Sequence, residues 1–345
     1  MEYTKIPVKN VYYMLCYAWN RLQEKEFVSV GQEQDRDIYH LLTRVLLEQL
    51  QSLIKRGFYR EYTELTEETA SLKGKINFQD SIRKLSFNRS KMVIQYAELN
   101  HDTLHNRIIK TTLFNLLHVK DLDPGLRDQV IRIYSYFGEI SLISLNARIF
   151  TEVRLHRSNK YYGFVLDICK LFYDCLLMNE EESDLKFMDF QRNHQEMAAL
   201  FESFVRNFYR AECTEFKVTR EVIYWDAEGE DLSLLPRMET DISLECDSYK
   251  IIMDTKFYHS AYIQRYDLEK LISGNLYQIF AYLNNYRQAN HANKKTVIGI
   301  LLYPKVDKEL DLTYVIKGHP LNVYTVDLNK SWQSIHNRLI DIVNI

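Results

Sequence analysis

The sequence contains little glycine, proline or cysteine: of 345 residues, ten are glycine, five are proline and five are cysteine. Aromatic rings are plentiful by comparison, with 25 tyrosines and 17 phenylalanines. Few turn-forming residues and many rings favour long regular elements around a sizeable core. Apolar residues make up 46% of the chain and charged residues 26%. Both values are typical of folded globular proteins and exclude a largely disordered or collagen-like chain.

The five cysteines are far apart, and no two of them form a C-x-x-C pair. Because their number is odd and their spacing irregular, neither a disulfide framework nor a zinc ribbon is expected. The first residues lack the basic and then apolar pattern of a signal peptide, and no uncharged apolar run has the length of a membrane span. We therefore expect a reduced, cytoplasmic protein without a membrane partner.

Length and charge predict two domains, because 345 residues exceed the size at which one hydrophobic core usually stops growing. Residues 1–180 hold 25 basic and 22 acidic side chains (+3), and residues 181–345 hold 19 and 25 (−6), which sum to the −3 of the whole chain. An acidic run at 179–184 ends a helical pattern. We place the boundary there, with one domain at 1–180 and another at 181–345.

The first half is predicted to be a mostly helical α+β domain. Apolar side chains recur at helical spacing in four segments, which are 41–54, 108–117, 126–137 and 161–178. Asp102 is the expected N-cap of the second helix. Between the first two helices, residues 71–92 carry six basic side chains and one acid, Asp80. This segment is either a solvated loop or a contact for phosphates or for an acidic partner surface.

The second half is predicted to be an α/β domain with a mixed sheet. A helix at 193–211 precedes strands at 216–224, 238–246 and 249–257, and the short Asp247-Ser248 link makes the last two strands a hairpin. The elements expected after the hairpin are a helical region at 265–288 interrupted at 273–275, a strand at 296–303 buried on both faces, a strand near 322–327 and a helix at 331–343.

Charged residues gather at the end of the apolar strand 251–257. Alternation along a strand places Asp254 and Lys256 on the same face, and the hairpin brings Asp241 beside them. Two carboxylates and an ammonium group this close are costly unless a cation or ligand compensates. Carboxylate oxygens bind Mg²⁺, which polarises a phosphoryl oxygen and lowers the pKa of a water molecule that a lysine can orient. The pattern therefore suits metal-assisted phosphodiester hydrolysis.

The acid-x-Lys tripeptide is a weak signal by itself, because the sequence contains two others, at Asp184 and Glu215. Neither follows a strand hairpin that would supply a second acid, so context selects Asp254 and Lys256 among the three tripeptides. The alternative for this pair is an exposed, salt-bridged strand end. A later helix carries two residues that can bond phosphate oxygens, and an earlier helix carries an acid beside its apolar stripe. The candidate catalytic residues are thus Asp241, Asp254, Lys256, Gln278 and Tyr282, and the candidate metal ligands are Asp241, Asp254, Thr255 and Glu202.

This order of motifs resembles the PD-(D/E)XK nuclease superfamily in its RecB-like branch. The wider sequence resembles the McrC family, the nuclease subunits of McrBC-type, GTP-dependent restriction systems. The segments that carry this second resemblance are 6–19, 73–76, 99–110, 234–242 and 275–278.

The resemblance implies a C-terminal domain of the PD-(D/E)XK restriction-endonuclease type with Asp241, Asp254 and Lys256 as its motif, Mg²⁺ as cofactor and Mn²⁺ as its substitute. It also implies an N-terminal domain that docks onto an AAA+ GTPase hexamer and stimulates GTP hydrolysis, and double-stranded DNA containing 5-methylcytosine as substrate. The chain has no G-x-x-x-x-G-K-[ST] loop, so no nucleotide is expected to bind to it alone. Two alternatives stay open, a catalytically idle GTPase-activating or DNA-positioning subunit and a repair nuclease outside restriction.

Overall fold

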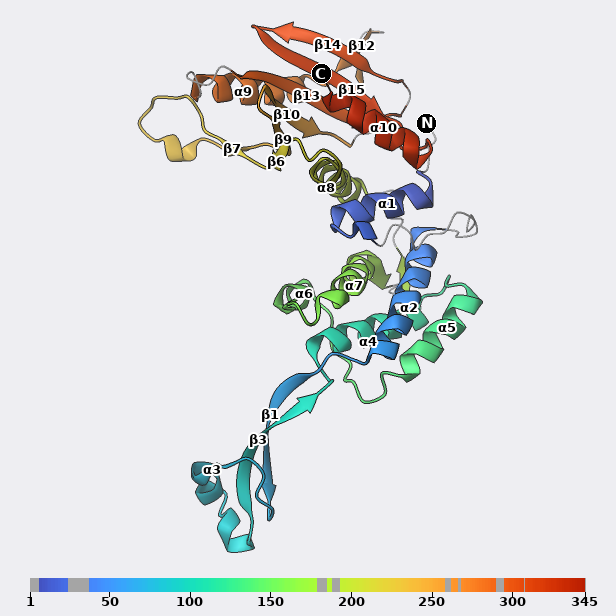
Figure 1. The fold of residues 1–345 in the computed structure, drawn as a ribbon, viewed down its shortest axis with the longest axis vertical. Coiled ribbons are helices and arrows are strands. Elements are labelled where there is room, and N and C mark those ends of the chain that lie inside the picture. The colour runs from blue at the N-terminus through green and yellow to red at the C-terminus, as the bar shows by residue number, and fades with distance from the viewer. Residues whose placement is uncertain are drawn as a thin grey trace. The chain divides into compact units, whose positions relative to one another are not determined.

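The computed structural model describes residues 6–23, 37–178, 185–187, 193–257, 262–265, 268–289, 295–306 and 308–344 (Figure 1). The chain forms two compact units. The sheet unit combines residues 1–38 with 189–345, and the inserted unit comprises residues 39–188.

The N-terminal helix α1 (Val8–Ala18) belongs to the sheet unit, which corrects the expectation that residues 1–180 form one domain. It packs on α8 (His194–Glu212), where Asn207 donates hydrogen bonds of 3.0 Å to the carbonyl oxygens of Tyr17 and Ala18. Asn10 donates to the carbonyl oxygen of Leu328 at 2.8 Å. The helix lies with the second half of the chain because its polar and apolar partners are there. The boundary expected at 179–184 lies outside the described residues.

The inserted unit is helical apart from one long ribbon and a short strand pair. Its elements are α2 (Ile38–Arg56), β1 (Glu61–Thr69), β2 (Lys75–Ile76), α3 (Phe78–Arg83), η2 (Ser86–Arg89), β3 (Met92–Asn100), α4 (Leu104–Leu117), α5 (Pro124–Ser135), α6 (Ala147–Glu152), η3 (Lys160–Tyr162), α7 (Gly163–Cys175), β4 (Leu176–Met178) and β5 (Leu185–Phe187). The four predicted helices are confirmed as α2, α4, α5 and α7, with shifted ends. The N-cap of α4 is Thr103 and not Asp102, whose carboxylate instead pairs with Arg107 and Ser141.

The β1–β3 ribbon is the main feature of this unit that sequence patterns did not predict. The two strands pair antiparallel over nine residues each, from Glu61 opposite Asn100 to Thr69 opposite Met92, and α3 lies at the far end of the ribbon (Figure 1). Most side chains of β1 are exposed. A strand that buries neither face has no need of apolar alternation, so its sequence gives little signal.

The sheet unit is an α/β structure, as predicted. After α1 and α8 its elements are β6 (Lys217–Thr219), β7 (Val222–Ile223), η5 (Leu232–Leu234), β8 (Met238–Glu239), β9 (Ile242–Glu245), β10 (Tyr249–Thr255), β11 (Tyr262–Arg265), β12 (Leu268–Leu271), α9 (Ser273–Ala289), β13 (Thr296–Pro304), β14 (Asp311–Ile316), β15 (His319–Val326) and α10 (Trp332–Val343). Six strands form one sheet in the order β14-β15-β13-β10-β9-β6. The β10–β13 and β13–β15 pairs are parallel and the other three are antiparallel, so the sheet is mixed.

Several local expectations need adjustment. The β9–β10 hairpin is confirmed, with Met253 opposite Ile242. The strands expected at 216–224 and 238–246 are each split in two, because β7 and β8 pair with each other outside the large sheet. The helix expected at 265–288 is wrong in its first part, where β11 and β12 form a hairpin, and α9 begins where an interruption was expected. The edge strand β14 was missed because its side chains are mostly exposed.

The core of the sheet unit places α9 directly on the central strands. Gly299 of β13 allows this approach, because a Cβ atom there would come within 2.7 Å of Leu283 and 3.1 Å of Ile279. Ile252 of β10 packs in the same apolar cluster. Alternation then turns Met253 to the other side of the strand, and α8 also contacts β10. The carboxyl end of β10 therefore lies between α8 and α9. No helix within the described ranges combines the length and apolarity of a membrane span.

Candidate active site

Asp254 is the penultimate residue of β10, between β9 and β13, and its side chain is 0% exposed. Within the described part of the chain, neither carboxylate oxygen has a well-directed hydrogen bond. Its closest charged neighbour is Lys256, whose Nζ lies 2.8 Å from Oδ2 as an ion pair. Burial and the charge of Asp241 raise the pKa of Asp254 to about 7, against the opposing effect of Lys256. A buried acid that has one lysine as its ion-pair partner and no well-directed hydrogen bond is costly to ionise, and a bound cation would compensate for that cost.

Asp241 lies in the turn between β8 and β9, beside the end of β10, as predicted from the hairpin. Its Oδ2 accepts hydrogen bonds from the backbone N–H of Thr255 at 2.8 Å and from the Thr255 hydroxyl at 3.0 Å. The side chain of Thr255, a candidate metal ligand, therefore serves as a donor that orients Asp241. The structure brings Asp241, Asp254 and Lys256 together at one strand end.

Lys256 is held by a chain of hydrogen bonds that starts on α9. Its Nζ donates to Gln278 Oε1 at 3.0 Å, and Gln278 Nε2 donates to the Tyr282 hydroxyl at 2.8 Å. The Tyr282 hydroxyl in turn donates to the backbone carbonyl of Glu239 at 3.1 Å. The two α9 residues share one face, as their i, i+4 spacing predicts. In this arrangement they orient the lysine, whereas the sequence suggested direct contacts to phosphate.

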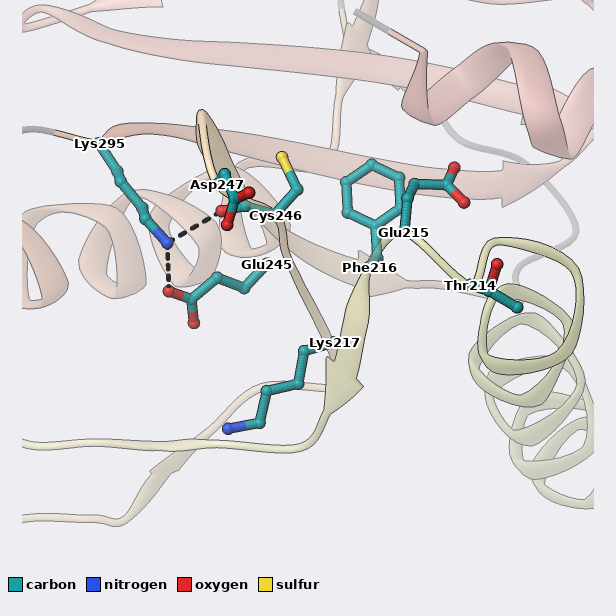
Figure 2. A pocket seen from close by; sticks show the side chains of 8 residues that line it. All are labelled: Thr214, Glu215, Phe216, Lys217, Glu245, Cys246, Asp247 and Lys295. Carbon is teal, nitrogen blue, oxygen red and sulfur yellow. Dashed lines mark hydrogen bonds and ion pairs between the residues drawn. The ribbon is translucent and has the colours of Figure 1, made fainter.

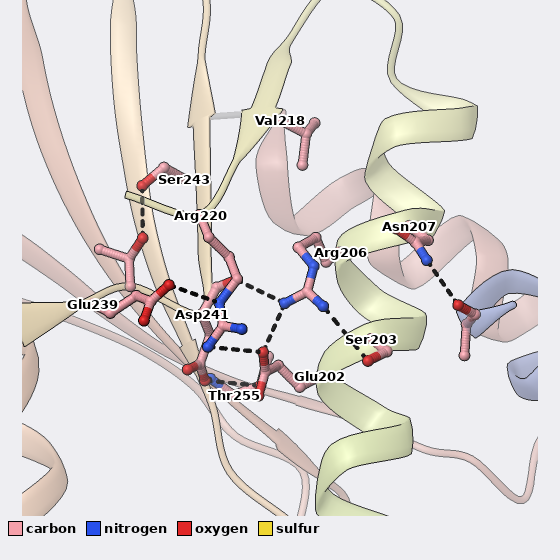
Figure 3. Close-up of polar contacts among 12 residues, drawn as sticks. Glu202, Ser203, Arg206, Asn207, Val218, Arg220, Glu239, Asp241, Ser243 and Thr255 are labelled. Atoms are coloured by element: carbon pink, nitrogen blue, oxygen red, sulfur yellow. Dashed lines mark hydrogen bonds and ion pairs between the residues drawn. The ribbon is translucent and has the colours of Figure 1, made fainter. Parts of the chain in front are cut away.

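Glu202 on α8 lies near the pair of aspartates but is held by arginines. Its Oε1 accepts a 2.6 Å hydrogen bond from Arg206, which also donates to the carbonyl oxygen of Asp241 at 3.2 Å (Figure 3). The Glu202 charge contributes to the raised pKa of Asp254, although less than burial and Asp241 do. No cluster of three or more His, Cys, Asp or Glu side chains in the described part of the chain is arranged to hold a metal ion. Glu202 as a ligand stays a prediction.

Two arginines near the site were not found from the sequence. Arg206 follows Glu202 at i+4, a spacing that could have indicated the pair. Arg220 lies in the link between β6 and β7, and nothing in its local sequence suggests a site. Only the folding of that link against α8 brings its side chain to Glu202, with 3.8 Å between Nη2 and Oε1.

A separate open pocket of about 410 Å³ lies at the opposite end of β10 (Figure 2). It is lined by Thr214, Glu215, Phe216, Lys217, Glu245, Cys246, Asp247 and Lys295. Lys295 donates to Glu245 at 2.9 Å and to the carbonyl oxygen of Cys246 at 2.9 Å. Because its central charges neutralise each other, this pocket is a weaker candidate than the strand end at Asp254.

Fold and site together define an α/β protein with a mixed sheet and a carboxylate–lysine centre at the end of a central strand. Residues 4–304 match the family model described as McrBC 5-methylcytosine restriction system component, and the chain belongs to that family. It is 36% identical over 345 residues to the type IV methyl-directed restriction enzyme EcoKMcrBC of Escherichia coli (strain K12), covering 99% of this chain and 98% of that protein.

Two solved structures from Thermococcus gammatolerans are also similar. One is a half-complex from a tetradecameric assembly of McrB AAA+ hexamers with bound McrC. Its matching chain has a TM-score of 0.61 and is 18% identical in sequence, and the match covers 98% of this chain and 76% of that chain. The other is the McrBC complex, with a TM-score of 0.46, 21% identity, and 83% and 70% coverage. The first similarity shows that the overall fold is shared.

Proposed function

We propose that this chain is the DNA endonuclease component of a GTP-dependent restriction complex that acts on DNA containing 5-methylcytosine. The observation that carries the proposal is the buried carboxylate of Asp254, which has no well-directed hydrogen bond, pairs with Lys256 at 2.8 Å and lies beside the second acid, Asp241. Membership of a restriction-system family supports DNA as the substrate. The hydrolytic domain is then of the PD-(D/E)XK type.

Asp241 and Asp254 would hold Mg²⁺, with Mn²⁺ as a substitute, because hard carboxylate oxygens are the ligands these cations prefer. When bound, the cation would supply Lewis-acid polarisation of a phosphoryl oxygen and lower the pKa of a water molecule. Thr255 and Glu202 are the further candidate ligands. Glu202 would have to leave its 2.6 Å bond with Arg206 to take part.

Lys256 would orient the attacking water and stabilise charge that develops on the phosphate. A catalytic lysine must be held in place, and the hydrogen bonds through Gln278 and Tyr282 to the backbone of β8 do this. Since Asp254 also contacts Nζ at 2.8 Å, the lysine and the proposed ligand are positioned as one group.

The inserted unit would dock onto an AAA+ GTPase hexamer and stimulate its GTP hydrolysis. The solved relative with bound AAA+ hexamers supports such a partner. At the far end of the ribbon, the basic segment 71–92 exposes large apolar side chains among its lysines and arginines, namely Leu72, Phe78, Ile82, Leu85 and Phe87. Exposed apolar groups gathered in this way are typical of an interaction surface.

The proposal is tested by reconstituting the chain with its GTPase partner and measuring cleavage of methylated DNA in Mg²⁺ and GTP. Asp254→Ala and Lys256→Ala should each abolish cleavage and leave GTP hydrolysis intact. Lys295→Ala is the matched control, because this lysine also pairs with a carboxylate in the sheet unit but lies in the separate pocket at the opposite end of β10. Normal cleavage by either active-site variant would show that the assignment is wrong.

A non-catalytic, GTPase-activating subunit is the second candidate function. The position of Glu202 favours it, because Glu202 is bound to Arg206 and, within the described residues, no three acids are arranged to hold a metal ion. Calorimetric titration with Mn²⁺ separates the two functions. A nuclease should show a site that disappears in Asp241→Ala and in Asp254→Ala, and an idle subunit should show no such site.

A further inference from the structure

Arg220 is weakly held and lies near two acids. Its neighbour Arg237 is also weakly held, 4.0 Å from Glu239 Oε1 and 66% exposed, but within the described residues it has no ion pair with Glu202. The Arg220 guanidinium lies between two carboxylates, with 3.6 Å from Nε to Glu239 Oε1 and 3.8 Å from Nη2 to Glu202 Oε1 (Figure 3). Both distances exceed hydrogen-bonding range. The side chain is 46% exposed. Within the described residues, these two long ion pairs are the polar contacts of its guanidinium group.

Arg206, which also pairs with Glu202, is by contrast held firmly by hydrogen bonds. It is 15% exposed, and its Nη1 donates to Glu202 at 2.6 Å and to the carbonyl oxygen of Asp241 at 3.2 Å. The second bond connects α8 to the turn that carries Asp241. Arg220 makes no comparable connection. Long, half-exposed ion pairs contribute little to stability, so replacing them with a new anion costs little.

The position of Arg220 relates it to the proposed chemistry. Glu202, which it approaches, bonds to Arg206 and is close enough to raise the pKa of Asp254. Four acids lie in this region, which are Glu202, Glu239, Asp241 and the buried Asp254, and their charge repels a DNA phosphate. Lys256, the lysine of the site, already pairs with Asp254 and donates to Gln278. Binding of the DNA backbone beside these acids therefore needs a cationic side chain whose hydrogen-bond donors are not already used.

We propose that Arg220 binds a backbone phosphate of the DNA at the mouth of the active site, an inference that rests on the proposed nuclease function. The planar guanidinium donates two parallel hydrogen bonds to phosphate oxygens, a geometry that lysine cannot reproduce. On DNA binding, Arg220 exchanges Glu239 and Glu202 for the phosphate. It thereby offsets the repulsion between the acids and the DNA and positions the strand.

The test measures binding of a fluorescein-labelled 40-base-pair duplex to the full-length chain by anisotropy, across a series of NaCl concentrations and in Ca²⁺. Arg220→Ala should weaken binding and reduce the slope of log K against log salt by about 0.9, as expected for one lost phosphate contact. Arg220→Lys should keep the slope and bind more weakly than wild type. Arg210→Ala is the control, because Arg210 on α8 already hydrogen-bonds Asn207 at 2.9 Å, and it should match wild type.

Wild-type affinity and slope in Arg220→Ala would overturn the inference, and so would the absence of DNA binding by wild type at low salt. Unchanged melting temperatures of both Arg220 variants are expected, because the arginine makes only long contacts. If Arg220→Ala fails to fold, the Lys variant decides, since identical binding to wild type would exclude bidentate phosphate contact. Loss of affinity in Arg220→Ala together with no cleavage by wild type would contradict the proposed nuclease function and support the phosphate contact.

Discussion

Asp241 accepts two hydrogen bonds from a single residue, Thr255, through the backbone N–H at 2.8 Å and the hydroxyl at 3.0 Å. These bonds tie the turn before β9 to the last residue of β10. Asp241 is thereby kept beside Asp254, although the two carboxylates repel each other and burial disfavours ionisation of Asp254. A bound cation would offset this repulsion between the two carboxylates.

Asp254→Asn should stabilise the metal-free protein at high pH. The folded-state pKa of Asp254 is about 7, above its ordinary value of 3.8, so ionisation favours the unfolded chain. The protonated Asp254 carboxyl therefore makes its full contribution to the free energy of unfolding below about pH 4, and this contribution is lost as pH rises through about 7. Urea denaturation in EDTA should show wild type losing on the order of 2 kcal/mol relative to the variant between pH 5 and pH 8. An equal difference at both values would contradict the raised pKa.

Tyr282→Phe should slow DNA cleavage with little effect on metal binding. The change removes the hydroxyl that accepts from Gln278 and donates to the Glu239 carbonyl, so Lys256 loses its fixed support. We expect a stability loss of about 1 kcal/mol and a cleavage rate reduced about tenfold, equivalent to ~1.4 kcal/mol in the barrier. Tyr314→Phe on the exposed edge strand β14 is the control. Full activity in Tyr282→Phe would show that the lysine does not depend on this support.

Charge reversal at Lys73, Lys75, Arg83 and Lys84 should abolish GTPase stimulation without unfolding the chain. These residues lie in the exposed segment 71–92, where Arg83 makes only a 3.3 Å ion pair with Asp80 and Lys73 lies over the Tyr96 ring. GTP hydrolysis by the partner is measured at increasing concentrations of the variant. Reversal of Arg148 and Lys170, exposed residues of the same unit, should have no effect. Normal stimulation by the fourfold variant would rule out docking through this segment.

Gly74→Ala should disorder the far end of the ribbon. Gly74 has φ +76°, and a Cβ atom there would overlap the carbonyl oxygen of Gln95 on β3. Both the left-handed conformation and the close approach therefore exclude a side chain. Hydrogen exchange should show lost protection over 71–96 and unchanged protection in the sheet unit. Wild-type protection in the ribbon would mean that the strands can shift to accept the methyl group.

Asp102→Asn should destabilise the inserted unit at neutral pH. Hydrogen bonds from Arg107 and Ser141 hold the pKa of Asp102 well below its ordinary value. Its stabilising contribution is therefore present above about pH 4 and is lost as pH falls through the lowered pKa. We expect a loss of about 1–3 kcal/mol in the variant at pH 7. Thermal unfolding followed from pH 7 to pH 3 should show the difference from wild type shrinking in acid.

The sequence by itself predicted the elements whose patterns are strong and local. The apolar stripe of α8, the continuous apolar run of β13 and the short link of the β9–β10 hairpin each specify their structure within a few residues. The hairpin with its strand alternation was sufficient to place Asp241, Asp254 and Lys256 together. Residue spacing likewise put Gln278 and Tyr282 on one face of α9.

Tertiary structure decided everything that depends on contacts between distant segments. The place of α1 against α8 follows from side chains about 190 residues apart, which no local pattern records. The β1–β3 ribbon buries too little for its alternation to show. Arg206 reaches the carbonyl oxygen of Asp241, and Arg220 comes near Glu202, only because α8 packs beside the turn before β9 and the link between β6 and β7. The spacing of residues along the chain determines which side chains lie on the same face of a helix or strand. The packing of distant segments determines which charged groups lie next to them.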